Sequence, residues 1–297
     1  MPAPDTPSDR RRRLARRVAD AHGALGDPSM LALVSGSVVD DLADEQSDVD
    51  MSIVFDMLPP ESVLRGACEA AGGTPWFWQA GALAEGSLVV AFRLDGVEVQ
   101  IAYSDAATLA RELDQVLVAH DPDSPNHKLA EGLLKAEALA GGEQLAVLQA
   151  RVAAFPPALG RAMVAHFLGR ITPWRAITQL IERDASLWCR DLQVQAGYRL
   201  LGALAGLNGR YFTTFQFKHL QRFAAGLTNA PPGFARRLER VLASEARPAF
   251  VELHALEGEV LDRVEQHWPD LDLAAVRQRW RAFAPAAADD RGAARTD

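Results

Sequence analysis

Two aspartates and a glycine–serine pair are the residues of this chain whose types and spacing suit phosphate chemistry. Asp48 and Asp50 stand two positions apart at the start of an apolar run, so in a strand their carboxylates point to the same face. Neighbouring carboxylates repel each other unless a cation lies between them, and Mg²⁺ is the usual cation when substrate phosphates supply other ligands. Upstream, Gly36 lets the backbone approach a phosphate closely and Ser37 adds a hydroxyl. A phosphate cradle beside a metal-binding pair is what phosphoryl or nucleotidyl transfer requires.

These residues must be held in place by strands, and the surrounding sequence predicts such strands. Apolar runs of strand length lie just before the glycine–serine pair and just after the two aspartates. Asp95 and Gly96 then separate two further runs, and this dipeptide is typical of a two-residue hairpin turn. Five strands are expected, at residues 30–34, 49–55, 76–80, 88–94 and 97–103.

The last of these strands carries a candidate third acid. Alternation places Val97, Val99 and Ile101 on one face and Glu98 and Gln100 on the other. Glu98 is ionised at neutral pH and suits a metal ligand or a general base. Gln100 is the alternative for the third position, but an amide binds a cation weakly and cannot act as a base. A glutamine there would mean that the site lacks an acid.

The two motifs together resemble a known family signature. Gly36 and Ser37, followed by Asp48 and Asp50 before an apolar strand, look like the motif of the polymerase-β-like nucleotidyltransferase superfamily. The stretch that contains both motifs resembles the small-molecule branch, which includes the aminoglycoside nucleotidyltransferases. The resemblance covers residues 30–105, and the helical remainder resembles the accessory domain of such enzymes only in general character.

The resemblance implies an activity and roles for the site residues. It implies an Mg²⁺-dependent enzyme that moves a nucleoside monophosphate from a nucleoside triphosphate, with ATP as the expected donor, to a hydroxyl of a small, cationic acceptor. Asp48 and Asp50 would hold the metal, and Glu98 would complete the metal site or deprotonate the acceptor. Gly36 and Ser37 would hold the β- and γ-phosphates.

A lysine is a second candidate for the phosphates. The chain has three lysines among 31 basic residues, so a lysine can reflect a specific need for a point charge. Lys218 follows a loop that enters a helix and is the best candidate to contact the triphosphate. The three lysines are Lys128, Lys135 and Lys218.

The pattern predicts an α/β fold of two domains. A small mixed-sheet nucleotidyltransferase domain is expected at residues 9–120 and an all-helical domain at 121–284, with the polar loop near residue 120 as the boundary and the site in the cleft between them. Residues 1–8 and 285–297 are expected to be disordered. Helices are expected at residues 9–25, 59–71, 106–119, 129–140, 143–154, 157–169, 174–207, 215–227, 232–243, 247–267 and 273–284. Ser8 is the expected cap of the first helix, and its arginine run at 10–13 is interpreted as a solvated face.

Charge and composition narrow the class of partner. Residues 38–105 hold thirteen acidic and two basic side chains, a net charge of −11 within a chain of net charge −8. Such a region disfavours nucleic acid, since nucleic-acid affinity depends on neutralising phosphates, and it suits metals and cationic acceptors. No apolar run approaches the length of a membrane span, and the two cysteines lack a metal-type spacing. The polar, arginine-rich start with no apolar run behind it argues against a secretory leader. We therefore expect a cytoplasmic protein; the sequence leaves its oligomeric state open.

Two other functions remain open at this stage. One is a nucleotidyltransferase that modifies protein or RNA, as in toxin–antitoxin pairs of the same superfamily. The other is a nucleotide-sensing domain that keeps the fold without turnover. Binding of ATP with Mg²⁺ but no pyrophosphate release with any acceptor would favour the sensor.

Overall fold

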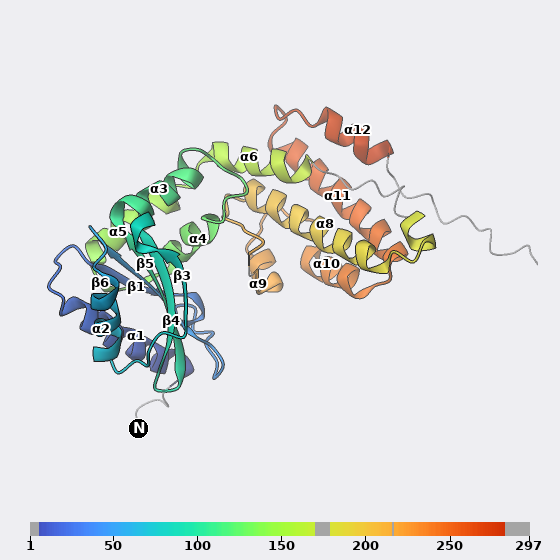
Figure 1. The fold of residues 1–297 in the computed structure, drawn as a ribbon. Helices are drawn as coiled ribbons and strands as arrows, with labels where there is room; N and C mark the ends of the chain where they lie inside the picture. Colours follow the sequence, from blue (N-terminus) through green and yellow to red (C-terminus); the bar gives the residue numbers. More distant parts are fainter. Residues whose placement is uncertain (1–5, 170–178, 216, 283–297) are drawn as a thin grey trace, which may run out of the picture. The chain divides into compact units, whose positions relative to one another are not determined.

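The computed structural model describes residues 6–169, 179–215 and 217–282, which divide into two compact units (Figure 1). Among these residues the first unit comprises 6–119 and 128–155, and the second comprises 120–127 and 156–282. The predicted disorder of residues 1–5 and 285–297 lies outside the described residues.

The first unit is built on a mixed six-stranded sheet, with the strand order β3-β4-β5-β2-β1-β6. All neighbouring strands run antiparallel except β2 and β5, which are parallel. This confirms the predicted α/β class with a mixed sheet. The strands are β1 (Leu31–Ser35), β2 (Val49–Phe55), β3 (Trp78–Ala82), β4 (Ser87–Leu94), β5 (Val97–Asp105) and β6 (Glu137–Ala140).

Apolar and polar side chains alternate along β2 and β5, so the centre of the sheet has one apolar face and one polar face. On the apolar face, Val49, Met51 and Ile53 of β2 pack in one cluster with Val99 and Ile101 of β5. Side chains of α1 (Pro7–Gly23) and α2 (Glu61–Ala70) join the same cluster and cover this face (Figure 1). The polar residues between these positions therefore point to the opposite face, where they stay half-buried.

The strand β6 was not predicted, and it belongs to a later segment of the chain that returns to the first unit. The expected helix at 129–140 ends early, as α4 (His127–Lys135), and β6 then pairs antiparallel with β1. Residues 128–155, including α5 (Gly142–Ala153), belong to the first unit. The units change at residue 120, where the boundary is predicted, but the chain returns to the first unit at residue 128 and leaves it again after residue 155. The four residues of β6 include two alanines, which favour helices in isolation, and they show no clear alternation of polar and apolar side chains. The strand conformation of this segment therefore depends on its pairing with β1.

The first helix also begins earlier than expected. Thr6, and not Ser8, caps α1: Thr6 Oγ1 accepts from the Asp9 N–H, and Asp9 accepts in return from the Thr6 N–H, both at 3.1 Å. Ser8 lies inside the helix and is buried. Residues 6–8, expected to be disordered, are therefore ordered by the cap.

Every regular element in the described part of the second unit is a helix, as predicted for this half of the chain. Its most extensive contact joins α6 (Pro157–Leu168) to α8 (Ser186–Leu207). A Cβ at Gly202 would lie 2.4 Å from the Phe167 ring, and one at Gly206 would lie 2.7 Å from the Gly160 carbonyl, so both glycines permit the close helix approach. The other helices are α9 (Leu220–Ala225), α10 (Phe234–Ala243), α11 (Ala246–His267) and α12 (Ala274–Ala282), and α3 (Ala106–Leu117) belongs to the first unit.

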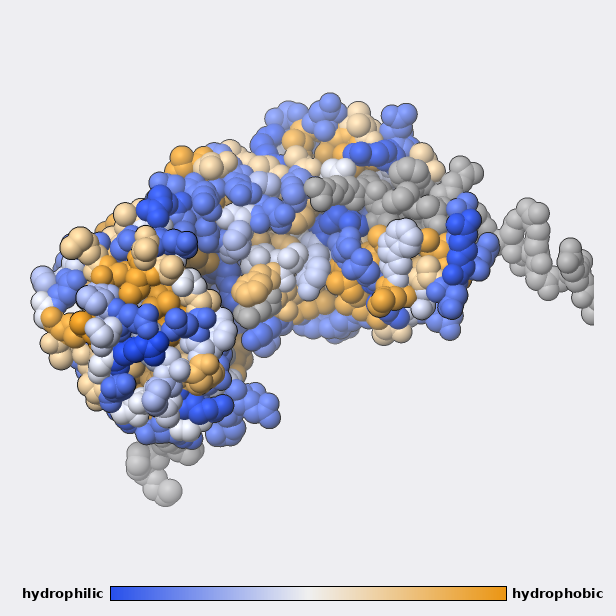
Figure 2. All heavy atoms as spheres, in the orientation of Figure 1, coloured by the Kyte–Doolittle hydropathy of each residue, from blue (hydrophilic) through white to orange (hydrophobic). Residues whose placement is uncertain are grey.

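Hydrophobic side chains are interspersed with hydrophilic ones over the surface of both units seen in Figure 2. No helix among the described residues is both long and apolar enough to traverse a bilayer.

A buried chain of polar groups runs through the core of the first unit. His22 Nδ1 lies 2.8 Å from the Val18 carbonyl, which can only accept, so Nδ1 carries the proton. His22 Nε2 therefore accepts from the Tyr103 hydroxyl at 2.7 Å, and the Tyr103 oxygen accepts from the Cys68 thiol at 3.3 Å. Because His22 is fully buried, desolvation lowers its pKa, against a smaller opposing effect of the Val18 carbonyl.

This arrangement predicts that the protein loses stability in mild acid. The pKa of His22 lies below its unfolded value of about 6.5, so below that pH the unfolded state binds more protons. We expect the free energy of unfolding to be highest above pH 6.5 and to fall by up to about 1.4 kcal/mol per pH unit for this residue as the pH decreases towards its folded pKa. Urea unfolding at pH 7.5 and pH 5.5 measures the effect. A His22→Leu protein should lose less between the two pH values; an equal loss would assign the effect to other groups, such as His127.

Candidate functional site

The predicted phosphate turn follows β1 directly and lies against Asp50. Gly36 has φ +71° and opens a single 3-10 turn, η1 (Gly36–Val38). Across the β1–β2 pair, Ser35 is the register partner of Asp50. A Cβ placed on Gly36 would lie 2.5 Å from Asp50 Oδ2, so the carboxylate sits in space that only a glycine leaves open. Ser37 is half-buried in the same turn, and its carbonyl accepts from the Leu42 N–H at 2.9 Å.

Glycine at position 36 should therefore be required for two separable reasons. Alanine at Gly36 adopts a left-handed backbone, which costs about 1–2 kcal/mol, and it also collides with Asp50. Gly26 is a matched control, since it has φ +78° and a Cβ added there would meet open space. We expect Gly36→Ala to lower the free energy of unfolding in urea clearly more than Gly26→Ala does. Equal losses would mean that Asp50 leaves the turn without cost.

The structure brings the predicted acids together on the polar face of the sheet. Asp48 and Glu98 both accept hydrogen bonds from the Gln100 side-chain amide, Asp48 Oδ2 at 3.3 Å and Glu98 Oε1 at 3.0 Å. Gln100 is also the register partner of Asp50 across the parallel β2–β5 pair. All four side chains are half-buried, so solvent and ligands can reach them. Glu98 and Gln100 thus share one face with the two aspartates, as their alternation predicts.

The Gln100 amide has a defined electrostatic effect. Its two N–H groups point at two carboxylates and supply positive partial charge between them. This offsets the repulsion that Asp48 and Glu98 would otherwise exert. In the ranges described, no group of three or more acidic, histidine or cysteine side chains is placed to hold a metal ion. Gln100, and not Glu98, is the residue opposite Asp50 in the parallel β2–β5 register.

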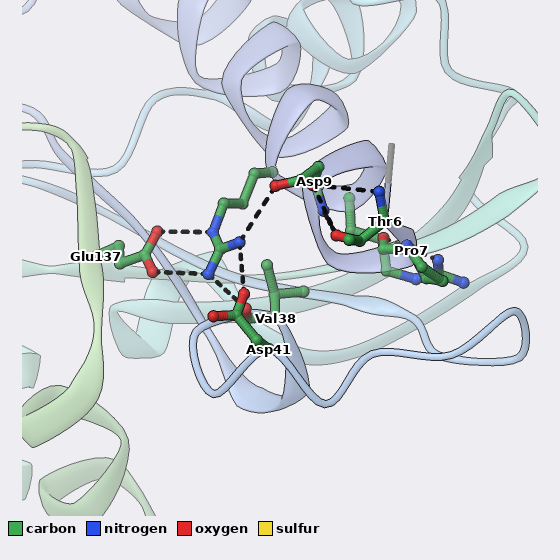
Figure 3. A network of polar contacts seen from close by, with 8 residues as sticks. Thr6, Pro7, Asp9, Val38, Asp41 and Glu137 are labelled. Carbon is green, nitrogen blue, oxygen red and sulfur yellow. Dashed lines mark hydrogen bonds and ion pairs between the residues drawn. The ribbon is translucent and has the colours of Figure 1, made fainter. Parts of the chain in front are cut away.

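The loop after the turn is held by arginines that the sequence analysis assigned to a solvated helix face. Arg11 is 1% exposed, and its Nε donates to the Ser47 carbonyl at 2.7 Å, next to Asp48. Arg12 donates to the Val38 carbonyl at 2.9 Å and pairs with Asp41 and Glu137 (Figure 3). The solvated-face interpretation is therefore wrong for Arg11 and Arg12. The sequence does contain an indication that Arg11 is buried, because its spacing places it on the same side of the helix as the buried Leu14 and Val18.

The lysines divide between the units. Lys218 is exposed in the segment that precedes α9, in the second unit, whereas the predicted acids all lie in the first. In the first unit Lys135 lies at the end of α4, and its Nζ is 3.6 Å from Asp40 in the loop after the turn. Sequence reasoning ranked Lys218 above Lys135 because nothing in the local pattern shows that residue 135 returns to the turn.

Comparison with known proteins gives little further information. No protein-family model and no curated protein sequence matches this chain. A solved structure, a nucleotidyltransferase-like protein from Exiguobacterium sibiricum 255-15, is similar over 86% of this chain and 77% of that one. The two sequences are 14% identical and the TM-score is 0.40. A likeness of this size leaves the assignment of an activity to the residues of the site.

Proposed function

We propose that this protein is a nucleotidyltransferase that moves a nucleoside monophosphate from a nucleoside triphosphate to a hydroxyl of a small acceptor. The observation that carries the proposal is the position of Asp50. Its carboxylate lies against the Gly36 turn, on the face that also presents Asp48 and Glu98. A backbone turn able to approach phosphates and carboxylates able to bind a cation thus meet at one place, as transfer between phosphates and hydroxyls requires.

The donor set fits Mg²⁺ as a cofactor. Asp48 and Asp50 would hold the ion through hard carboxylate oxygens, and Mg²⁺ commonly takes only one or two protein carboxylates while phosphates and water complete its shell. When bound, the ion would neutralise charge on the reacting phosphate and on the attacking and leaving oxygens.

The other residues of this face have roles that follow from their chemistry. The N–H groups of the Gly36 turn would bind the outer phosphates, and Ser37 would add its hydroxyl. Glu98 would accept the proton of the acceptor hydroxyl, because a carboxylate near neutral pH is a competent base once the Gln100 amide turns away from it. Lys218 is kept as a proposed phosphate contact. ATP is the proposed donor.

The acceptor is proposed to be small and cationic. The segment 38–105 carries a net charge of −11, which attracts cations and repels polyanions. An aminoglycoside-like amine-rich molecule fits this charge, whereas nucleic acid does not.

One observation favours a second candidate, a nucleotide sensor without turnover. The Gln100 amide donates one hydrogen bond each to Asp48 and Glu98, so two of the three carboxylates have a positively polarised partner without a bound cation. A site with an amide and not an acid opposite Asp50 would bind a nucleotide with its Mg²⁺ and release it unchanged.

A screen of pyrophosphate release distinguishes these candidates. The purified protein is incubated with Mg²⁺, each of the four nucleoside triphosphates, and either no acceptor or a panel that includes aminoglycosides, tRNA and test proteins. Acceptor-dependent release with a small amine supports the proposal. Release that needs tRNA or protein would support a macromolecule-modifying enzyme, and ATP binding with no release in any combination would support the sensor.

A further inference from the structure

The loop between β1 and β2 carries the proposed phosphate turn at one end and Asp48 at the other. Short turns form within it: the Leu42 N–H donates to the Ser37 carbonyl at 2.9 Å, and Ser47 Oγ and the Gln46 N–H both donate to Asp44 Oδ1 at 2.9 Å. These bonds join residues that are near neighbours in sequence, so the loop as a whole needs partners on other elements to keep one path.

Two consecutive arginines of α1 supply those partners. Arg12 reaches the early part of the loop: one Nη donates to the Val38 carbonyl at 2.9 Å and the other lies 2.8 Å from Asp41 Oδ1. Arg11 reaches the late part through the Ser47 carbonyl, and its Nη1 donates to the Pro7 carbonyl at 3.1 Å. These contacts join the loop residues Val38 and Asp41 to Glu137, all three of which are labelled in Figure 3.

Arg12 is itself fixed from a third segment. Glu137 of β6 accepts from both Nε and an Nη of Arg12, each at 3.1 Å, in a paired geometry that sets the plane of the guanidinium. Asp9 on the same helix lies 3.7 Å away. The hydrogen bonds that Arg12 donates to the Glu137 and Asp41 carboxylates raise the pKa of Arg12, so it stays charged. One side chain thus ties α1, β6 and the loop together.

We propose that Arg12 is a positioning residue that holds the β1–β2 loop in the conformation that receives the triphosphate. This inference rests on the proposed function, since it assigns to that loop the binding of phosphates. The loop would contact phosphates in the bound substrate and in the transition state alike. Loss of Arg12 should therefore weaken nucleotide binding and raise KM, and kcat should change much less.

The test compares Arg12→Met with Arg10→Met. Methionine keeps the apolar stem of Arg12 and removes its charge and donors. Arg10 is an exposed neighbour on the same helix that donates to the Asp95 carbonyl at 3.0 Å, away from the loop, and serves as the matched control. The dissociation constant for ATP with Mg²⁺ is measured by calorimetry, kcat and KM by pyrophosphate release, and loop order by the rate at which a Glu-specific protease cuts after Glu45.

We expect Arg12→Met to raise the ATP dissociation constant and KM by at least about tenfold, the effect of losing a hydrogen bond to a charged group. Its kcat should stay within about threefold, its loop should be cut at least about tenfold faster, and Arg10→Met should match the wild type. Arg12→Lys should restore part of the affinity, because an ammonium can meet one partner but cannot span three. Should Arg12→Met not fold, Glu137→Gln replaces it, with the same direction of change and a smaller size.

Equal affinity and equal loop cleavage in the Arg12→Met and Arg10→Met proteins would overturn the inference. A loss confined to kcat would overturn it as well. The cleavage measurement needs no nucleotide, so it tests the loop separately from the proposed function. If the wild-type protein does not bind ATP but the Arg12→Met loop is still cut faster, the proposed function is contradicted, and the conclusion that Arg12 holds the loop is supported.

Discussion

An Asp50→Asn protein is expected to fold like the wild type and to lose nucleotidyl transfer. Asparagine has nearly the same size and still fits beside Gly36, but it removes the charge that would attract the cation and the donor phosphates. We expect kcat/KM to fall by more than about 10³-fold, on the scale of removing a charged catalytic group. Pyrophosphate release measures the loss, and circular dichroism with thermal unfolding checks the fold.

The control for this prediction is Asp56→Asn. Asp56 follows the other end of β2 and is exposed, so the same chemical change there should leave turnover unaltered. Near-normal activity in a well-folded Asp50→Asn protein would remove Asp50 from the metal site and with it the main support for the proposed chemistry.

The second large effect is expected at Glu98. Glu98→Gln keeps a hydrogen-bond acceptor for the Gln100 amide but removes the base, so turnover should fall by at least about 10²-fold, and ATP affinity should change little. The neighbouring Gln100→Ala protein should be affected mildly in turnover. Its free energy of unfolding at neutral pH should instead be lower by about 1 kcal/mol, because the hydrogen bonds that the Gln100 amide donates to Asp48 and Glu98 are lost. The two variants are compared by pyrophosphate release and by urea unfolding.

The opposite ranking would change the view of the site. If Gln100→Ala abolished turnover and Glu98→Gln did not, the amide beside Asp50 would be the group that contacts the substrate. If neither variant nor the wild type showed turnover, while all three bound ATP with Mg²⁺, the sensor would become the better description.

Local rules predicted the centre of the sheet well. The Asp95–Gly96 turn has φ values of +50° and +80°, which is the left-handed pair that its dipeptide favours, and β4 and β5 pair across it. Strict alternation in β5 placed Glu98 and Gln100 on one face without any knowledge of the fold. These features depend on neighbours in sequence, so a single sequence is enough to find them.

The features that could not be predicted from the sequence depend on contacts between residues far apart along the chain. Strand β6 exists because β1 offers it an open edge, not because residues 137–140 favour a strand. Arg12 meets Glu137 across 125 positions. Whether the Gln100 amide would turn towards Asp48 and Glu98 depends on side-chain geometry that alternation leaves undefined. In each case tertiary contacts override local preference.

The order in which the chain builds the two units affects its folding during synthesis and the choice of stable fragments. The chain passes between the two units three times, at residues 119–120, 127–128 and 155–156. During synthesis, β1 has no partner on its outer edge until residues 137–140 have left the ribosome, and an unpaired edge invites association with other chains. A fragment that stops near residue 120 would carry the acids of the site and yet lack both this edge strand and Glu137. The smallest fragment that can complete the sheet therefore extends to about residue 155, and it must carry an eight-residue excursion, 120–127, that packs with the other half of the protein.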